Sequence, residues 1–286
     1  MKIIDTHIHL WDLENGSYPW LEGDSSILNR SYFMEELEQQ RKGTTVEYGI
    51  LVQAANNDQD TAYMLKVAEE SDWIKGVVGW LPLTDPGQSE KLLEQKYLQN
   101  LYFKGVRHLI HNESDPKWLL QASVLESLGI LADNELPFDV VGVLPEHLET
   151  AIKVAEQLPN LSLVLDHLNQ PPIAQKLKFG SWGTLMEKAS RYPNIHVKIS
   201  GLGTTIGRPF QWLASDIYEY LEFAISKFGY KRCFLGGDWP VSLLAGSYTH
   251  TWKQYENALV DLLTENELKG VCFENAAEFY NLKLKL

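Results

Sequence analysis

The stretch "IIDTHIHLWD" (residues 3–12) places two histidines one residue apart, directly after a short apolar run. In a β-strand, residues i and i+2 point to the same side, so His7 and His9 would aim both imidazoles at one point while Ile8 faces the other way. A strand end of this kind can hold a metal ion or a polarised group of a substrate. The alternative is a pair of histidines in a solvated loop, and further ligands elsewhere in the chain decide between the two.

The pattern of this first strand recurs along the chain. Short apolar segments alternate with amphipathic segments of helical length, which predicts parallel strands joined by right-handed helical crossovers. Eight strands close a (β/α)8 TIM barrel of the α/β class, and a chain of 286 residues suits one such domain over 1–286. The predicted strands cover residues 2–6, 47–53, 75–81, 103–109, 137–143, 161–167, 195–201 and 232–238.

A doubly wound open sheet is the alternative architecture. It would be favoured by a glycine-rich phosphate loop after an early strand, and the sequence has none there. The glycine-rich segment "GLGTTIG" (201–207) follows the seventh predicted strand, so we interpret it as a loop over the mouth of a barrel.

Residues of metal-ligand type lie at, or just after, the carboxyl ends of three predicted strands. The active sites of such barrels lie at the carboxyl ends of the strands, where this sequence places His7, His9, His167 and Asp238. Three imidazoles and one carboxylate suit zinc with an open position for water or substrate. Taken singly, His167 could be a turn residue and Asp238 a helix cap. Asp5 is expected to support the histidines rather than bind the ion.

Other side chains near the predicted mouth are candidates for binding a substrate. Trp11 and Trp239 directly follow the histidine pair and Asp238, so we expect these two of the nine tryptophans near the site, although core packing is the alternative. Trp20 and Trp182 also fall at predicted mouth positions. The substrate-binding candidates are Arg107, His108, Trp11, Trp80, Lys198 and Trp239. For Lys198, the alternative is a structural ion-pair partner inside the barrel.

Composition narrows the possible partners. The formal net charge of −13 argues against nucleic acid, and the chain has no polybasic segment for a membrane surface. No stretch approaches the roughly 20 apolar residues of a membrane span. Cys233 and Cys272 are the only cysteines, so no disulfide framework is expected. With no signal-like segment at the N-terminus, the sequence predicts a cytoplasmic protein. Barrels of this size often dimerise, so a homodimer is a possible assembly.

Four motifs in this order resemble the amidohydrolase superfamily, and more narrowly its sugar-lactonase branch. They are "DTHIHLWD" (5–12), "VLDHLNQPP" (164–172), "VKISGL" (197–202) and "GGDWPVSLL" (236–244). This branch includes the L-fuconolactonases and L-rhamnonolactonases, and the lactonases of 2-pyrone-4,6-dicarboxylate are relatives. The resemblance runs along essentially the whole chain and implies a (β/α)8 barrel that hydrolyses an ester or amide at its mouth.

The resemblance also implies roles for the matching residues. His7, His9, His167 and Asp238 would bind a divalent ion or the scissile carbonyl, and Asp238 would take the proton from the attacking water, with His167 as the second catalytic residue. Binuclear members carry a bridging lysine or glutamate on a middle strand, and no such residue is clearly placed here. We therefore expect one divalent metal at most, with zinc preferred. In the pyrone-lactone relatives the same residues are thought to act without a metal.

These observations together predict an enzyme that opens a sugar (aldono-) lactone by water attack on the carbonyl, in carbohydrate degradation. A dicarboxylate substrate would want bidentate arginines, and only Arg107 and Arg208 are candidates near the mouth, so a neutral small-molecule lactone is favoured. The alternatives are a 2-pyrone-4,6-dicarboxylate-type lactone hydrolase, a metal-dependent decarboxylase of the same superfamily, and a barrel that binds a ligand without catalysis.

Overall fold

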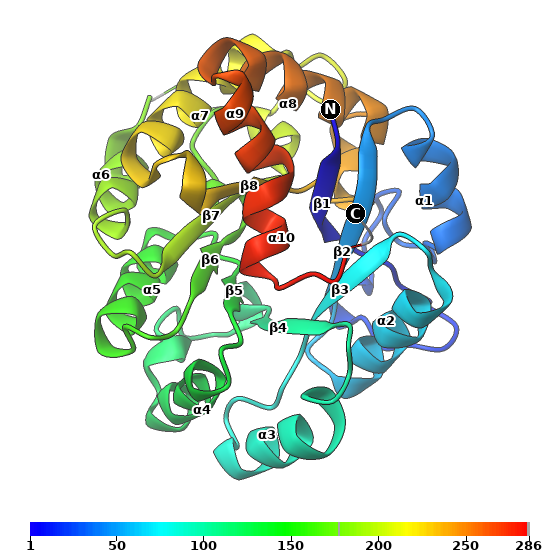
Figure 1. Cartoon of the computed structure of the whole chain (residues 1–286), viewed down its shortest axis with the longest axis vertical. Coiled ribbons are helices and arrows are strands. Elements are labelled where there is room, and N and C mark those ends of the chain that lie inside the picture. The colour runs from blue at the N-terminus through cyan, green and yellow to red at the C-terminus, as the bar shows by residue number, and fades with distance from the viewer. Residues whose placement is uncertain (177, 285–286) are drawn as a thin grey trace.

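The computed structural model describes residues 1–176 and 178–284. Its eight strands are all parallel and neighbour one another in chain order, and they form a barrel surrounded by helices (Figure 1). The prediction of a (β/α)8 barrel is therefore confirmed. The strands are β1 (Ile3–Ile8), β2 (Val46–Val52), β3 (Ile74–Gly79), β4 (Phe103–His108), β5 (Phe138–Val140), β6 (Leu163–Leu165), β7 (Ile195–Ile199) and β8 (Cys233–Leu235).

The barrel closes where β1 meets the end of β8. The His9 backbone N–H donates to the Trp239 carbonyl at 2.7 Å, and the Asp238 N–H donates to the His7 carbonyl at 2.7 Å. We call this junction of β1 with β8 and the residues after it the seam. Nearer the amino ends of the strands, the Thr6 hydroxyl donates across the seam to the Leu235 carbonyl at 2.7 Å. The bonds that close the barrel thus join the chain at the two predicted ligand histidines to the chain at the predicted ligand aspartate.

Helices cover the outer faces of the strands, as amphipathic segments do when their apolar stripe packs on a sheet. Several begin at a side-chain cap; the Asn57 side chain, for example, accepts from the Asp60 N–H at the start of α2. Within the described residues, no helix combines the length and hydropathy that a membrane span requires. The helices are α1 (Met34–Arg41), α2 (Asp58–Glu70), α3 (Pro86–Leu92), α4 (Ala122–Asp133), α5 (Pro145–Gln157), α6 (Gly180–Ala189), α7 (Ala214–Phe228), α8 (Tyr248–Leu262), α9 (Glu265–Lys269) and α10 (Asn275–Phe279).

The last helix closes the amino end of the barrel. In Figure 1, α10 lies across the strands near the centre of the view, and the chain after it packs against the starts of β3 and β4. Tyr280 is 2% exposed and packs among side chains of the barrel interior. The interior cluster contains Ile4, Ile50, Val52, Val78, Val164, Phe234, Ala276, Tyr280 and Leu282. With this end closed, the opposite mouth is left for chemistry.

An irregularity in β1 separates a supporting residue from the site. The pairing of β1 with β2 shifts register between Asp5 and Ile8. Asp5 and His7 would share a face in a regular strand, but the shift lets Asp5 turn toward α8 while His7 enters the barrel. The Asp5 carboxylate accepts from the Gly237 N–H at 2.7 Å and the Tyr248 hydroxyl at 2.6 Å. The same carboxylate accepts from the His7 N–H at 3.0 Å, so Asp5 supports both the backbone of His7 and its link to the chain after β8.

Replacing Tyr280→Ala should lower the free energy of unfolding by about 3–5 kcal/mol, because it empties a buried aromatic site at the closed end of the barrel. Denaturant unfolding followed by circular dichroism measures this loss. The control is Phe210→Ala, since Phe210 is 68% exposed and should change stability by no more than about 0.5 kcal/mol. Equal stability of the two variants would contradict a closing role for Tyr280.

Candidate active site

Three of the four predicted ligands meet at the bottom of the barrel mouth. His7 Nε2 lies 3.0 Å from His9 Nε2. Asp238 Oδ1 lies 3.8 Å from His7 Nε2 and 3.6 Å from His9 Nε2. Ligands bound tetrahedrally at 2.0–2.1 Å would lie about 3.3 Å apart, so these separations bracket those of a zinc-type ion. All three residues are buried.

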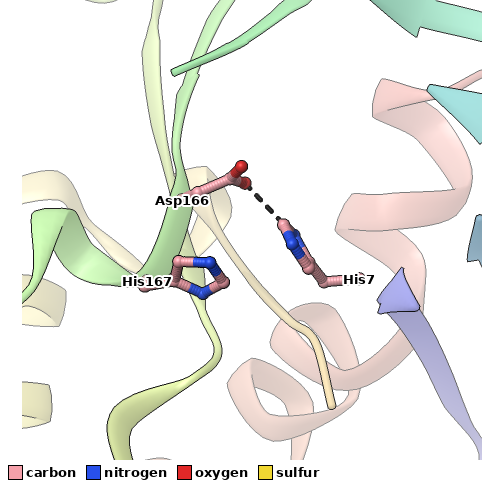
Figure 2. A group of neighbouring side chains, drawn as sticks. All are labelled: His7, Asp166 and His167. Carbon is pink, nitrogen blue, oxygen red and sulfur yellow. Dashed lines mark ion pairs between the residues drawn. The ribbon is translucent and has the colours of Figure 1, made fainter. Parts of the chain in front are cut away.

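Hydrogen bonds of the two histidines set which nitrogens remain free. His9 Nδ1 lies 2.8 Å from the Val52 carbonyl, which can only accept, so His9 Nε2 carries the lone pair. His7 Nδ1 lies 3.3 Å from Asp166 Oδ1 (Figure 2), and Arg107 Nη1, which can only donate, lies 3.2 Å from His7 Nε2; both contacts favour the same tautomer. The two Nε2 lone pairs then lie 3.0 Å apart, and among the described residues only that of His7 has a donor. A bound cation would interact with both lone pairs, so the donor set fits a divalent ion.

Burial keeps these imidazoles neutral. It lowers the pKa of His7 well below its usual value and that of His9 to about 3, with Arg107 adding to the shift at His9. Burial also raises the pKa of Asp238, while His167 and Arg107 oppose that shift. Neutral imidazoles are the form that binds metal ions. A carboxylate of raised pKa is a stronger base than an exposed one.

His167 approaches from the opposite side of the mouth, and its ring centroid is 4.6 Å from that of His7 (Figure 2). Its Nδ1 lies 2.8 Å from the Ser200 hydroxyl. β6 ends at Leu165, and His167 has a left-handed backbone (φ 55°). His167 and Asp238 were expected at the last positions of strands; both instead lie just beyond them with positive φ. Such strained backbone is often found at functional sites.

The backbone of Gly201 fits between two of these side chains. Its φ is +61°, and a Cβ there would come within 2.7 Å of His167 Nδ1 and 2.8 Å of Asp238 Oδ2. Only glycine therefore lets His167 and Asp238 keep their positions.

A buried network of charges lies directly beneath the site. The Lys198 ammonium is 2.6 Å from Asp139, 3.1 Å from Asp166 and 3.2 Å from His7 Nδ1. Arg107 Nη1 lies 3.2 Å from both Asp166 Oδ2 and His7 Nε2. These contacts hold the His7 ring between two cations and one carboxylate.

The pKa values of the network follow from burial and pairing. Burial alone would raise the pKa of Asp166, but Lys198 and His7 bring it well below its usual value. Burial raises the pKa of Asp139 to about 6 against the pull of Lys198. The pKa of Lys198 is raised because Asp139 and Asp166 outweigh its burial. Lys198 therefore stays charged as the structural ion-pair partner, which was the alternative interpretation of this residue.

A cavity of about 200 Å³ opens above the site. His9, Arg107, His167 and Asp238 contribute to its wall. The remaining wall is mostly apolar or uncharged and is formed by Trp20, Ala54, Leu109, His111, Val141, Val143, Gln170, Gly201, Thr204, Thr205 and Val241. Polar groups converging in a mainly apolar cavity are typical of a small-molecule site.

Two substrate-binding candidates from β3 and β4 do not line this cavity. The Trp80 Nε1–H donates to His108 Nδ1 at 3.0 Å, and His108 Nε2 lies 2.7 Å from Glu113 Oε1. His108 also stacks on Trp118 with ring centroids 4.0 Å apart. Trp80 and His108 therefore form a structural cluster beside the mouth.

The positions of Trp11 and Trp239 correct the expectation that they contact substrate. Both side chains are fully buried outside the cavity. Trp11 pairs with Tyr32 through its backbone, and its Nε1–H donates to the Arg30 carbonyl. Trp239 packs edge-on against Tyr32 and, as the neighbour of Asp238, faces away from the mouth. Trp20 lines the cavity instead, held by a 2.7 Å hydrogen bond to the Ala54 carbonyl.

Asp139 and Asp166, which pair with Lys198, were not among the residues predicted from the sequence. Their partners lie on β1, β4 and β7, and no local signal reports such pairing, although the position of Asp166 beside His167 was a hint. Gln170, Thr204 and Thr205 were not named as site residues, although the two threonines belong to the segment 201–207 that was expected over the mouth; they lie in a short 3-10 helix (Leu202–Ile206). Arg208 was proposed near the mouth; the structure pairs it with Asp216 on α7, away from the cavity.

The sequence profile of one family, described as amidohydrolase, matches residues 4–282. The chain belongs to the amidohydrolase family. The superfamily resemblance inferred from the four motifs is therefore confirmed.

Three relatives of this family member cover nearly its whole length. An L-fucono-1,5-lactonase of Burkholderia ambifaria is 27% identical over 98% of this chain and 95% of its own. An L-rhamnono-gamma-lactonase of Scheffersomyces stipitis is 25% identical over 98% of this chain and 99% of its own. The crystal structure of an amidohydrolase from Burkholderia multivorans with bound zinc is 28% identical, with a TM-score of 0.89 over 99% of this chain and 100% of that one.

Among the described residues of this family member, two groups of buried side chains have the composition of a metal site. One is His7, His9 and Asp238, and the other is His7, Asp166 and His167. Asp166 is already paired with Lys198 and Arg107, whereas Asp238 forms no comparable ion pair with a lysine or arginine among the described residues. The group of His7, His9 and Asp238 therefore fits a divalent ion better.

The network beneath the site leads to a stability prediction. Lys198→Met should lower the free energy of unfolding by about 3–5 kcal/mol, because it leaves two buried carboxylates without their shared cation. Denaturant unfolding measures the loss. The matched control is Lys227→Met, whose ion pair with Glu187 is exposed and worth about 1 kcal/mol or less. A loss no greater than that of the control would contradict the network.

Proposed function

We propose that this amidohydrolase opens an aldonolactone by adding water to the ring carbonyl. The observation that carries the proposal is the convergence of His7, His9 and Asp238, of which His9 and Asp238 line a small, mainly apolar cavity. The lactonase relatives, which extend over the whole chain, support the same class of cyclic ester. The product is the open aldonic acid, since the attacking water supplies the hydroxyl and the ring oxygen leaves as an alcohol.

Asp238 acts as the general base in this proposal. Its carboxylate faces the cavity beside His9, where it can accept a proton from a water that approaches the carbonyl carbon. His167 lines the same cavity and is oriented by Ser200. It can hold the water, or take the proton from Asp238 and pass it to the departing ring oxygen, so Asp238 and His167 are the proposed catalytic pair.

In this proposal Arg107 holds the carbonyl oxygen of the lactone. It lines the cavity, where it can donate a hydrogen bond to this oxygen as negative charge develops, and groups fixed in advance stabilise such charge best. A divalent ion bound by His7, His9 and Asp238, with zinc as the proposed metal, would supply Lewis acidity and lower the pKa of the attacking water. Without it, Arg107 remains a donor to the same oxygen.

A neutral ring suits this cavity better than a dicarboxylate. Arg107 is the arginine that lines it, and its guanidinium already bonds to Gln53, Asp166 and His7. A dicarboxylated pyrone would need a further bidentate cation, and Arg208 is engaged elsewhere. The apolar wall with Trp20 suits the hydrogen-bearing face of a sugar lactone.

Asp238→Asn should reduce kcat for lactone opening by about 10²–10⁴, because the amide cannot accept the proton. A pH indicator that reports acid release measures the rate, and circular dichroism checks that the fold persists. The control is Asp261→Asn, an exposed residue of α8. An unchanged rate in Asp238→Asn would exclude this residue as the base.

A second prediction concerns the metal. The protein dialysed against zinc should retain about one ion per chain, and His9→Ala should lower the zinc affinity at least about tenfold. Mass spectrometry of the native protein and isothermal titration measure both values. The control is His111→Ala, which removes an imidazole from the same cavity but not from the ligand group. Equal zinc affinity in His9→Ala would contradict the assignment.

A further inference from the structure

A second cavity of about 550 Å³ lies beside the first, between the segments that follow β5, β6 and β7. Val143, Gln170, Thr204 and Thr205 line both cavities. The two spaces are therefore separated at most by one layer of side chains. A molecule bound at Asp238 can extend past these four residues into the second space.

The second cavity has an uncharged wall of mixed polarity. Its apolar part includes Leu144, Leu148 and Trp182, and its polar part includes Asn169, Gln175 and Ser181. None of the described residues that line it carries a formal charge at neutral pH. A charged substituent would enter without a counter-ion, which is unfavourable in a partly enclosed site.

One amide at this wall is free to bind a ligand. Gln170 stands at the junction of the cavities, and the hydrogen bonds found for the described residues include none from its exposed side chain. The Asn169 Oδ1 is also without a hydrogen-bond partner among the described residues, but it is buried against Gly142. An alkyl substituent would remove water from the Gln170 amide without replacing its hydrogen bonds, whereas a hydroxyl group can pair with either end of the amide.

We propose that the second cavity is a subsite for a second sugar ring attached to the lactone, so that the preferred substrate is the lactone of an oxidised disaccharide. This inference rests on the proposed lactone hydrolysis. A sugar ring has an apolar face for Trp182 and Leu148 and hydroxyls for the amides of Gln170 and Gln175. Only the ester opens, and the glycosidic bond remains intact.

The test compares an aldonolactone with the same lactone carrying a glycosyl group. Wild-type kcat/KM should be at least about tenfold higher for the glycosylated lactone, since binding of the remote ring can be used in the transition state. Ser181→Trp, which places a bulky ring in the second cavity only, should remove this gain and leave the simple lactone unaffected. Thr184→Trp, an exposed position of α6 outside the cavity, should keep the gain.

Two results would overturn the subsite. One is equal kcat/KM with and without the second ring. The other is an equal or larger gain when the ring is replaced by an alkyl chain of similar size, which would indicate an apolar subsite instead.

A calorimetric measurement of how tightly the protein binds the ring-opened products, the aldonic acids, tests the subsite independently of the proposed lactone hydrolysis. The glycosylated aldonate should bind more tightly than the simple aldonate, and Ser181→Trp should abolish the difference. If no lactone is opened but this difference is found, lactone hydrolysis fails and the subsite stands. If a simple lactone is opened but the difference is absent, lactone hydrolysis stands and the subsite fails. If neither is found, both fail.

Discussion

The closure of the barrel between β1 and β8 is the constraint on which the site depends. The His7 carbonyl accepts from the Asp238 N–H, and the His9 N–H donates to the Trp239 carbonyl. These backbone bonds fix the distance between the chain at the histidines and the chain at the aspartate. Because the side chains project from the bonded residues themselves, barrel closure and assembly of the ligand group are one event. The supporting Asp5 is tied to the same seam through Gly237.

The charges beneath the seam give His7 its orientation at an energetic cost. Burying charged groups is unfavourable unless each has partners, and here Lys198 and Arg107 share Asp166. Asp139 forms a second ion pair with Lys198 and so adds the negative charge that offsets the two cations. Apolar side chains in this layer would avoid the cost of burying charge, and such side chains do fill the closed end of the barrel around Tyr280. The cost is consistent with a site that needs His7 neutral and fixed.

Much of the fold could be predicted from the sequence because its strands are short apolar runs in a regular alternation. The candidate ligand set could also be predicted, since polar residues at the ends of such runs converge in a barrel. What sequence could not supply were contacts between distant elements, such as Asp166 with Arg107. The roles of Trp11 and Trp239 were wrong for a related reason: adjacency to a functional residue says nothing about direction, and both side chains turn into the core. His167 and Asp238 lie in left-handed backbone just past their strands, which non-glycine residues seldom adopt and a strand pattern does not predict.

The central claim is that the seam residues hydrolyse an aldonolactone. The most direct test is acid release from a panel of purified aldonolactones, including L-fucono-1,5-lactone, with 2-pyrone-4,6-dicarboxylate beside them and heat-inactivated protein as the blank for spontaneous opening. The account predicts enzymatic opening of at least one aldonolactone and none of the pyrone. Opening of the pyrone alone, or no opening of any lactone, would contradict it.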